Sequence, residues 1–248
     1  MSADTLFSIK HFNTVSSTNT LAKDFAIKGE KEFTVILADS QTAGRGRLGR
    51  TFYSPENSGI YMSIILRPLL SPADTPLITT AAAVAVCRAL KKVCRITPEI
   101  KWVNDIYYKS KKVCGILTES SINVTCQSTD FVILGIGINL YENDFPKEIA
   151  DIAGALFESP PAEETKERLT AEILGEFYKI YLNITDRSFM EDYRNYSLIL
   201  GKRVFFRKNG EDFYGRAQKI DDDARLTVVL ENGEECVLYS GEVSVRLA

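Results

Sequence analysis

Apolar and polar positions alternate along most of the chain with two different spacings, one typical of strands and one of helices. In residues 59–67 both alternating sets are largely apolar, with Met62 and Ile64 in one set and Tyr61 and Ile65 in the other. This predicts a strand that is buried on both faces. The same criteria predict strands at residues 5–12, 33–39, 99–108, 113–120 and 131–140, and the polar residues 109–112 predict a hairpin between two of them.

Four other segments place apolar residues three or four positions apart, which is the spacing of one helix face. The strongest covers residues 74–94, where alanines and the row Leu77, Ala81, Val84 and Cys87 predict close packing on a sheet. The others are residues 19–28, 163–183 and 189–200.

After Gly201 the pattern changes to short strands separated by turns. Asn209-Gly210 and Asn232-Gly233 are strong hairpin signals. The predicted strands are residues 204–206, 213–220, 226–230, 235–239 and 242–246. We therefore expect a large domain over residues 1–198 and a small β-barrel over residues 199–248, packed on the large domain because so small a core is marginal alone.

Composition narrows the class of protein. Of 248 residues, 45% are hydrophobic and 25% charged, as in a globular protein. The net charge of −3 gives no overall attraction to nucleic acid. Apolar runs such as residues 81–86 are far shorter than the roughly 20 residues of a membrane span, and the first 12 residues lack the pattern of a secretory signal. We expect a cytoplasmic protein.

Few residues of this chain are suited to imidazole or thiolate chemistry. His11 is the only histidine, so a Ser-His-Asp or Cys-His mechanism would have to use it, and its place in a predicted strand favours a structural role. The five cysteines are scattered and odd in number, which argues against zinc and against a disulfide framework. They are Cys87, Cys94, Cys114, Cys126 and Cys236.

The most informative segment is the loop QTAGRGRLGR at residues 41–50. Its glycines match the dinucleotide fingerprint, but the following residues 51–59 contain too many helix breakers to supply the helix which that fingerprint requires. The P-loop motif is also absent from the sequence. Arg45, Arg47 and Arg50 suit phosphate or carboxylate oxygens, while a solvated basic turn is the alternative.

A second group of polar residues lies at the end of a predicted strand and on the strand that follows. Lys101, Asn104 and Asp105 come first, and Lys112 and Gly115 return beside them through the predicted hairpin. Buried lysine and aspartate seldom occur without partners, so we expect a mutually paired cluster. Its role can be structural or functional.

Together these motifs resemble those of the biotin protein ligase family. The resemblance covers nearly the whole chain and rests on five segments in the family's order: Ser16-Ser17-Thr18-Asn19, residues 41–50, Lys101-Trp102-x-Asn104-Asp105, Lys112-x-x-Gly115-Ile116-Leu117-x-Glu119 and Gly135-Ile136-Gly137-Ile138-Asn139. It implies an α+β fold in which helices flank a mixed sheet, as in class II aminoacyl-tRNA synthetases, followed by a C-terminal SH3-like barrel.

The resemblance also implies roles for individual residues. Biotin would be bound by Ser17, Thr18, Asn19, Gln41, Gly44, Arg45, Gly46, Arg47, Lys112 and Gly115. The nucleotide would be bound by Arg45, Arg47, Arg50, Phe52, Lys101, Asn104 and Asn139. Lys112, Arg47 and Asp105 would be catalytic, and no residue is assigned to a metal.

The implied reaction joins biotin to ATP, with Mg²⁺ as the activating ion, and then transfers biotin to a lysine of a biotin carboxyl carrier protein. Both first reactants are anionic, so Lys112 and Arg47 suit the charge that must be offset, and Asp105 could orient or deprotonate the acceptor amine. A glycine-rich loop could exclude water from the hydrolysable anhydride.

The chain departs from the family pattern at three places. Val103 replaces a usual proline, Phe52 a usual tryptophan, and the sequence reaches its Ser-Thr-Asn motif too early for the DNA-binding domain of repressor members, so no DNA partner is expected. Monomer and homodimer both occur in the family and both stay open. A ligase for lipoate or another acid and a non-catalytic biotin-binding regulator are the alternative functions.

Overall fold

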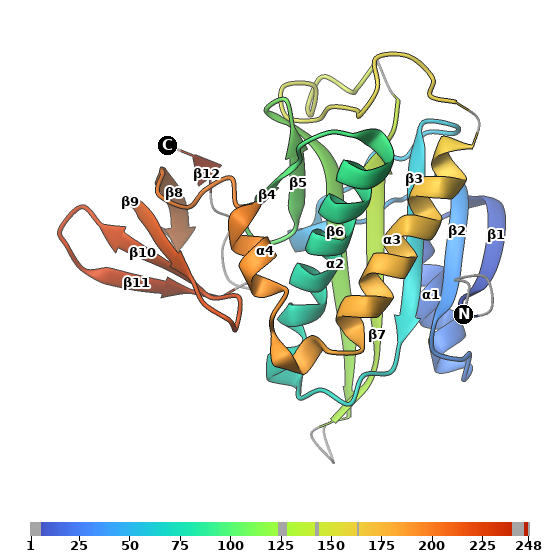
Figure 1. The fold of residues 1–248 in the computed structure, drawn as a ribbon, viewed down its shortest axis with the longest axis horizontal. Helices are drawn as coiled ribbons and strands as arrows, with labels where there is room; N and C mark the ends of the chain where they lie inside the picture. Colours follow the sequence, from blue (N-terminus) through green and yellow to red (C-terminus); the bar gives the residue numbers. More distant parts are fainter. Residues whose placement is uncertain (1–5, 124–127, 142–143, 163, 240–245, 248) are drawn as a thin grey trace.

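The computed structural model describes residues 6–123, 128–141, 144–162, 164–239 and 246–247. They form a large sheet covered by helices and a second, smaller sheet beside it (Figure 1). The large sheet is seven-stranded, in the order β1-β2-β3-β7-β6-β5-β4. Its strands are β1 (Ser8–Val15), β2 (Thr34–Gln41), β3 (Gly59–Leu66), β4 (Glu99–Lys101), β5 (Asp105–Tyr108), β6 (Lys111–Asn123) and β7 (Ser128–Asn139).

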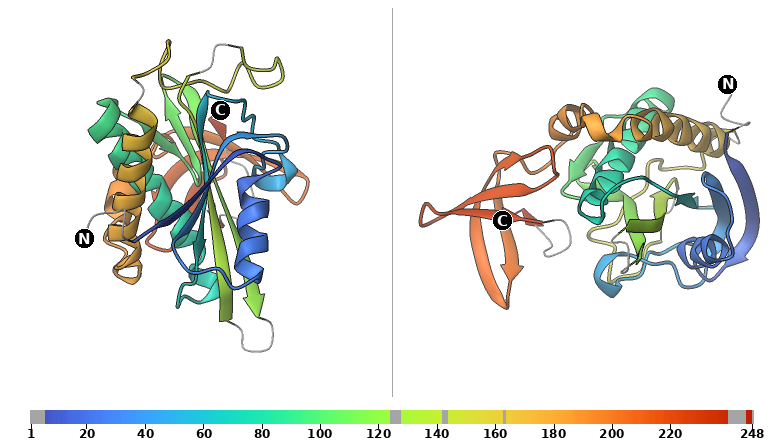
Figure 2. Two further views of the ribbon diagram at one scale, coloured as in Figure 1. Left: turned by 90° about the vertical axis from the view of Figure 1, so that its right-hand side faces the viewer. Right: turned by 90° about the horizontal axis from the view of Figure 1, so that it is seen from below.

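Helices cover both faces of the large sheet, α2 and α3 on one and α1 on the other (Figure 2). Helix α1 spans Thr18–Ile27, α2 spans Pro76–Ala89 and α3 spans Thr165–Tyr181. The small side chains of Ala81, Ala82 and Ala83 are fully buried, and this lets α2 lie close to the strands. No helix in the described part of the chain is long and apolar enough to cross a membrane.

Strand β3 is buried along its whole length, as the sequence predicts. It pairs with β2 on one side and β7 on the other, and only the β1–β2 pair of the large sheet is parallel. The prediction of a hairpin at residues 109–112 is also confirmed, with the turn at Lys109 and Ser110 between β5 and β6. The α+β fold with a mixed sheet flanked by helices is therefore confirmed.

Two predicted elements differ from the structure. The predicted strand 99–108 is a short hairpin, because residues 102–104 turn the chain and Lys101 pairs with Asp105. The predicted helix 189–200 is only the short helix α4 (Met190–Asn195). The chain beyond it pairs with β4 instead: Ile100 donates its backbone N–H to Tyr196 and accepts one from Leu198.

The smaller sheet has the order β11-β10-β9-β8-β12 and contains β8 (Arg203–Lys208), β9 (Glu211–Ile220), β10 (Leu226–Leu230), β11 (Glu235–Leu238) and β12 (Arg246–Leu247). Asn209 and Gly210 both have positive φ, 53° and 86°, which is what a tight hairpin turn requires. The predicted strand 242–246 lies outside the described residues except at Arg246. The turn between β9 and β10 contacts the larger sheet, where the indole N–H of Trp102 donates to the carbonyl of Ala224 (2.9 Å).

Candidate active site

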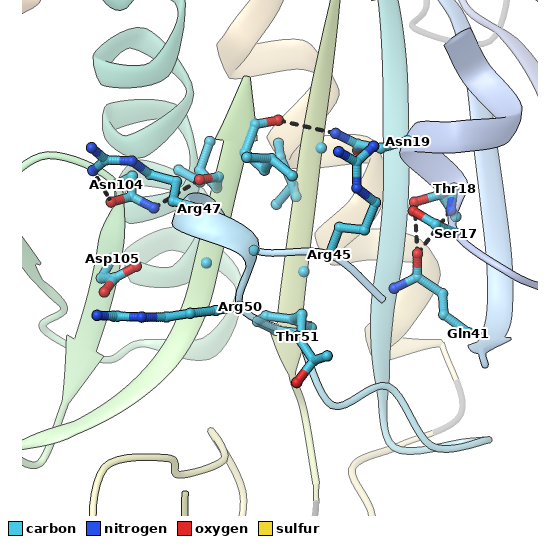
Figure 3. A pocket seen from close by; sticks show the side chains of 18 of the residues that line it. Ser17, Thr18, Asn19, Gln41, Arg45, Arg47, Arg50, Thr51, Asn104 and Asp105 are labelled. Atoms are coloured by element: carbon cyan, nitrogen blue, oxygen red, sulfur yellow. Dashed lines mark hydrogen bonds between the residues drawn. The ribbon is translucent and has the colours of Figure 1, made fainter. Parts of the chain in front are cut away.

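A pocket opens on the face of the large sheet that carries α1, under the loop that follows β2 (Figure 3). Its floor is formed by β6 and β7, one end by the start of α1 and the other by the turn between β4 and β5. The lining residues are Ser17, Thr18, Asn19, Gln41, Arg45, Gly46, Arg47, Leu48, Arg50, Thr51, Phe52, Met62, Asn104, Asp105, Lys112, Gly115, Ile116, Leu117, Gly135, Ile136 and Gly137.

The residues that line the end beside α1 are polar and uncharged: Ser17, Thr18, Asn19 and Gln41. Gln41 accepts hydrogen bonds at Oε1 from the backbone N–H (2.8 Å) and the hydroxyl (3.1 Å) of Thr18. Its amide group donates to Ser54 (2.8 Å). Ser63 lies behind, with its hydroxyl 2.8 Å from the Thr18 hydroxyl and 2.7 Å from Oδ1 of Asn19. These bonds fix several neutral donors and acceptors in one place, which suits an uncharged polar ligand.

The floor depends on three glycines, Gly115 on β6 and Gly135 and Gly137 on β7. Gly115 and Gly137 are directly paired, and the ring of Phe52 lies over both of them. A Cβ at Gly137 would come within 2.6 Å of that ring, and a Cβ at Gly135 within 2.0 Å of Oδ1 of Asn19. Glycine is therefore required here to admit these two side chains.

The loop over the pocket holds its shape through backbone bonds and two positive φ angles. Gly46 donates its N–H to the carbonyl of Arg50 (2.7 Å), which closes a 3-10 turn over Arg47–Gly49. Leu48 (φ 56°) and Gly49 (φ 72°) lie in the left-handed region within it. No α-helix begins here, so the missing context for a dinucleotide fingerprint is confirmed.

The opposite end of the pocket is charged. The ammonium group of Lys112 lies 2.7 Å from Oδ1 of Asp105. Arg47 donates to Oδ1 of Asn104 (2.9 Å), whose amide group donates to the carbonyl of Ile116 (2.8 Å). Burial lowers the pKa of Arg47, and the nearby carboxylate of Asp105 partly offsets this. Since an arginine stays protonated at any working pH, the end combines two cations with one carboxylate.

Two residues to which the sequence assigned no role in the site support the turn carrying Asn104 and Asp105. The buried hydroxyl of Tyr193 on α4 donates to the carbonyl of Val103 (3.0 Å), and Trp102 donates to Ala224. Burial raises the pKa of Tyr193, so this hydroxyl keeps its proton and stays a donor. The peptide bond between Trp102 and Val103 is cis.

Three predicted site residues do not line the pocket: Gly44, Lys101 and Asn139. Lys101 places its ammonium group 5.4 Å from the ring centre of Tyr107. Asn139 donates to the carbonyl of Gly154 (3.0 Å). Gly44 is part of the loop, at a point where a Cβ would come within 2.3 Å of the Phe52 carbonyl.

Other lining residues were not predicted. They are Leu48, Thr51, Met62, Ile116, Leu117, Gly135, Ile136 and Gly137. The apolar members look like ordinary core residues in the sequence. Gly135 and Gly137 did carry a usable signal, because two glycines one residue apart in a strand leave a groove on one face of a sheet.

The histidine and the buried cysteines, which would suit acid–base or nucleophilic catalysis, either lie away from the pocket or are poor nucleophiles. His11 pairs with Asp39 (3.0 Å) away from the pocket. Burial raises the pKa of Cys87 and Cys114, so neither thiol is a ready nucleophile. Within the described residues, no three His, Cys, Asp or Glu side chains gather as a metal site would require.

Comparison with known proteins identifies matching families over both parts of the chain. The model of the biotin/lipoate A/B protein ligase family matches residues 11–139, and that of the biotin protein ligase C terminal domain matches residues 199–246. The bifunctional ligase/repressor BirA of Bacillus subtilis is 34% identical over 95% of this chain and 73% of its own length. The biotin--[acetyl-CoA-carboxylase] ligase of Mycobacterium tuberculosis is 30% identical over 84% of this chain and 77% of its own.

Solved structures of the same kind share the fold. The biotin protein ligase from Aquifex aeolicus in complex with biotin and ATP has a TM-score of 0.78 at 28% identity, over 97% of this chain and 99% of that one. The ligase from Leishmania major in complex with biotinyl-5-AMP has a TM-score of 0.63 at 25% identity, over 94% and 98%. The chain therefore belongs to the biotin/lipoate A/B protein ligase family and carries the C-terminal domain of biotin protein ligases.

Proposed function

We propose that this protein is a biotin protein ligase, which activates biotin with ATP to biotinyl-5'-AMP and transfers the biotinyl group to a lysine of a biotin carboxyl carrier protein. The observation that carries the proposal is the pocket itself, in which a neutral polar end lies opposite an end with Lys112, Arg47 and Asp105. Relatives in this family are named for that reaction, and related structures hold biotin with ATP or biotinyl-5-AMP.

The neutral end suits the ring system of biotin. Ser17, Thr18, Asn19 and Gln41 are nearly buried or half-buried, and their hydroxyl and amide groups can bond an uncharged ureido ring without leaving a charge unpaired. Lipoate has a dithiolane ring in this position and would leave these groups unsatisfied. The match to the C-terminal domain of biotin protein ligases also favours biotin.

The charged end suits the first half-reaction. An oxygen of the biotin carboxylate attacks the α-phosphorus of ATP, a P–O bond breaks, and pyrophosphate leaves. We assign Lys112 and Arg47 to hold the two anions together and to stabilise the charge that develops, with Arg45 and Arg50 on the loop contributing to phosphate binding. We also retain Phe52 and Asn104 for the nucleotide, whereas Lys101 and Asn139 can act only if ligand binding rearranges the structure.

Asp105 belongs to the second half-reaction in this proposal. The acceptor lysine attacks the carbonyl carbon of the mixed anhydride, AMP leaves, and the amine must lose a proton. The Asp105 carboxylate lies on the pocket wall, where it can orient that amine or accept its proton. Its present partner is the ammonium group of Lys112, 2.7 Å away.

Mg²⁺ fits this site as a companion of ATP. Asp105 is the one carboxylate among the described lining residues and it is already paired with Lys112, so the wall offers no dedicated cation site. An ion bound by the phosphates would neutralise part of their charge. No residue of this chain is assigned to it.

A direct assay separates the proposed function from its alternatives. Purified protein with biotin, ATP and Mg²⁺ should form biotinyl-5'-AMP and should catalyse biotin-dependent exchange of pyrophosphate into ATP. Dependence on lipoate instead would select the related acyl ligase, and biotin binding without exchange would select the regulator. Failure to form the adenylate from either acid would refute the proposal.

Further parts of the proposal concern the organisation of the molecule. We place the domain boundary at residues 198 and 199, because a family match begins at residue 199 and the smaller sheet at Arg203. We place the reaction in the cytoplasm, since the cysteines Cys87, Cys94, Cys114 and Cys236 are unbridged. We assign no DNA-binding role, because the net charge is −3. The protein is a monomer or a homodimer in this proposal, and light scattering with and without ligands will distinguish the two.

A further inference from the structure

Glu119 lies behind the pocket and has no role in the function proposed above. It is the last residue of the motif that begins at Lys112. Along β6, Thr118 bonds Thr79 of α2 (2.7 Å), so it points to the face that α2 covers. Because strand side chains alternate, Glu119 points to the opposite face, where the pocket lies.

Two residues that line the pocket bind the Glu119 carboxylate. The guanidinium group of Arg45 makes a forked contact, 2.8 Å to Oε1 and 3.1 Å to Oε2. The amide group of Asn19 donates to Oε2 (2.9 Å). Figure 3 shows the Arg45 side chain directed toward Asn19. Glu119 is not one of the residues that line the pocket, and both of its carboxylate oxygens are bound by these two partners.

Arg45 belongs to the loop over the pocket, so its contact with Glu119 holds that loop in place. The backbone of Arg45 pairs with Thr51, which closes the base of the 3-10 turn at Arg47–Gly49. Arg47 bonds Asn104 at the other end. With Arg45 bound to Glu119 on β6 and Arg47 bound to Asn104 in the turn between β4 and β5, the loop spans the pocket before any ligand enters.

The partner on the other side, Asn19, links the same carboxylate to the neutral end of the pocket. Its Oδ1 accepts from Ser63 (2.7 Å), whose hydroxyl also contacts Thr18. With Oδ1 bound to Ser63 and the amide group bound to Glu119, the orientation of the Asn19 side chain is fixed. A single carboxylate therefore holds both the loop and one wall of the biotin end.

We propose that Glu119 is a positioning residue that holds Arg45, and with it the arginine loop, in the binding conformation while it orients Asn19. This extends the proposed function to a further residue of the same site. A loop that is ordered beforehand loses less conformational entropy when biotin binds, so the contact raises affinity for biotin without touching it.

Proteolysis of the ligand-free protein tests the anchoring of the loop. Trypsin cleaves after arginine, and Arg45, Arg47 and Arg50 all lie in this loop. Glu119→Gln removes the charge that binds Arg45 but keeps an oxygen that can accept from Asn19. Cleavage at the three sites, mapped by mass spectrometry, should become about 3- to 10-fold faster, because the loop opens more often. An unchanged cleavage rate would overturn the anchoring.

The matched control is Glu158→Gln, which removes a carboxylate from the exposed pair with Lys109 (3.3 Å), away from the pocket. It should leave cleavage of the loop unchanged. If it accelerates cleavage as much as Glu119→Gln, the effect is a general loss of negative charge and the proposal fails. This readout needs neither biotin nor ATP, so it stands apart from failure of the proposed function.

Binding measurements test the consequence for the ligand. Calorimetry with biotin should give a Kd about 3- to 10-fold higher for Glu119→Gln, and higher still for Glu119→Leu, which also removes the shorter of the two hydrogen bonds of the Asn19 amide and leaves it only the carbonyl of Leu117 (3.4 Å). The KM for biotin should rise while kcat stays within about 2-fold, as expected for lost pre-organisation. Equal binding by both variants would mean that the contact contributes nothing to affinity, and tighter binding would mean that it blocks the pocket; either result would overturn the proposal.

A double-mutant cycle identifies the partner. Arg45→Gln alone and Glu119→Gln alone should each weaken biotin binding, and the double variant should be no weaker than Arg45→Gln alone, because the second change removes a contact that is already lost. Additive losses would show that Glu119 acts independently of Arg45.

Discussion

Lys112 and Asp105 form the closest charge pair of the pocket, 2.7 Å apart. Asp105 lies on β5 and pairs with Gly115 of β6. The register of the two strands then shifts, so that Lys112 of β6 pairs with Tyr107. The shift matters because it turns Lys112 toward the same face as Asp105. In the proposed reaction the two residues act in different steps, so replacing each should affect a different half-reaction.

Lys112→Met should reduce adenylate formation about 10²- to 10³-fold, because it removes a fixed positive charge from the place where the carboxylate and the α-phosphate react. The measurement is biotin-dependent pyrophosphate exchange. Transfer from added biotinyl-5'-AMP should fall much less. Equal exchange rates in the variant and the wild type would rule out this role for Lys112.

Asp105→Asn should have the opposite profile. The variant keeps the shape of the side chain but cannot accept a proton, so transfer from added biotinyl-5'-AMP to the acceptor should fall about 10²- to 10⁴-fold. Biotin-dependent pyrophosphate exchange should fall less than about 10-fold, because the only change that affects this step is that Lys112 loses its carboxylate partner. Equal losses in both half-reactions would contradict an involvement of Asp105 in deprotonating or orienting the amine.

At the scale of the elements, the strands β6 and β7 build the floor of the pocket from glycines. The side chain of Phe52 can lie on the floor because Gly115 and Gly137 leave its ring room. Gly175 offers the contrast: it lies within α3, where an added Cβ would meet nothing within 4 Å. The same change, glycine to alanine, should therefore have opposite effects at the two positions.

Gly137→Ala should lower kcat/KM for ATP about 10- to 100-fold, because the new methyl group displaces the Phe52 ring that we assign to the nucleotide. Gly175→Ala is the control: it should leave activity unchanged and stabilise the protein by about 0.5 to 1 kcal/mol in urea denaturation, since alanine is the better helix former. A Gly137→Ala enzyme with normal ATP kinetics would argue against Phe52 as a nucleotide contact.

The elements with a long, regular pattern were predictable from the sequence. Strand β3 and helices α2 and α3 appear where their apolar spacing places them. Two local features were not predictable, because they depend on pairing between distant or returning segments. Residues 102–104 form a turn although their sequence is typical of a strand, and residues 196–198 pair with β4 although the sequence predicts a helix there.

The candidate site shows the same division. The loop and the Lys112 motif carried distinctive residues and could be located in the sequence, whereas Tyr193 could not, because a buried aromatic residue looks like core until its hydrogen bond is seen. Trp102 was visible in the motif at residues 101–105, but its role as a donor to Ala224 was not. Glu119 was visible in the motif, but its partners Arg45 and Asn19 are 74 and 100 positions away along the chain.

At the scale of the whole molecule, the smaller sheet contributes to the active site without reaching it. Its β9–β10 turn bonds Trp102, the first residue of the turn at residues 102–104 that leads to Asp105. Arg187 strengthens the same contact through ion pairs to Asp74 (3.1 Å) and to Asp223 (2.6 Å) in that turn. The two sheets are therefore joined next to the charged end of the pocket.

Trp102→Phe tests whether this junction positions the catalytic residues. The variant leaves the buried carbonyl of Ala224 without its donor, which should lower the free energy of unfolding by about 1 to 3 kcal/mol. It should also lower kcat for both half-reactions at temperatures where the protein is fully folded, because Asn104 and Asp105 lose a support. The control Ala224→Gly keeps the accepting carbonyl and relieves a positive φ of 62°, so it should keep full activity. If Trp102→Phe is less stable but equally active when folded, the smaller sheet only stabilises the larger one and has no part in placing the reacting groups.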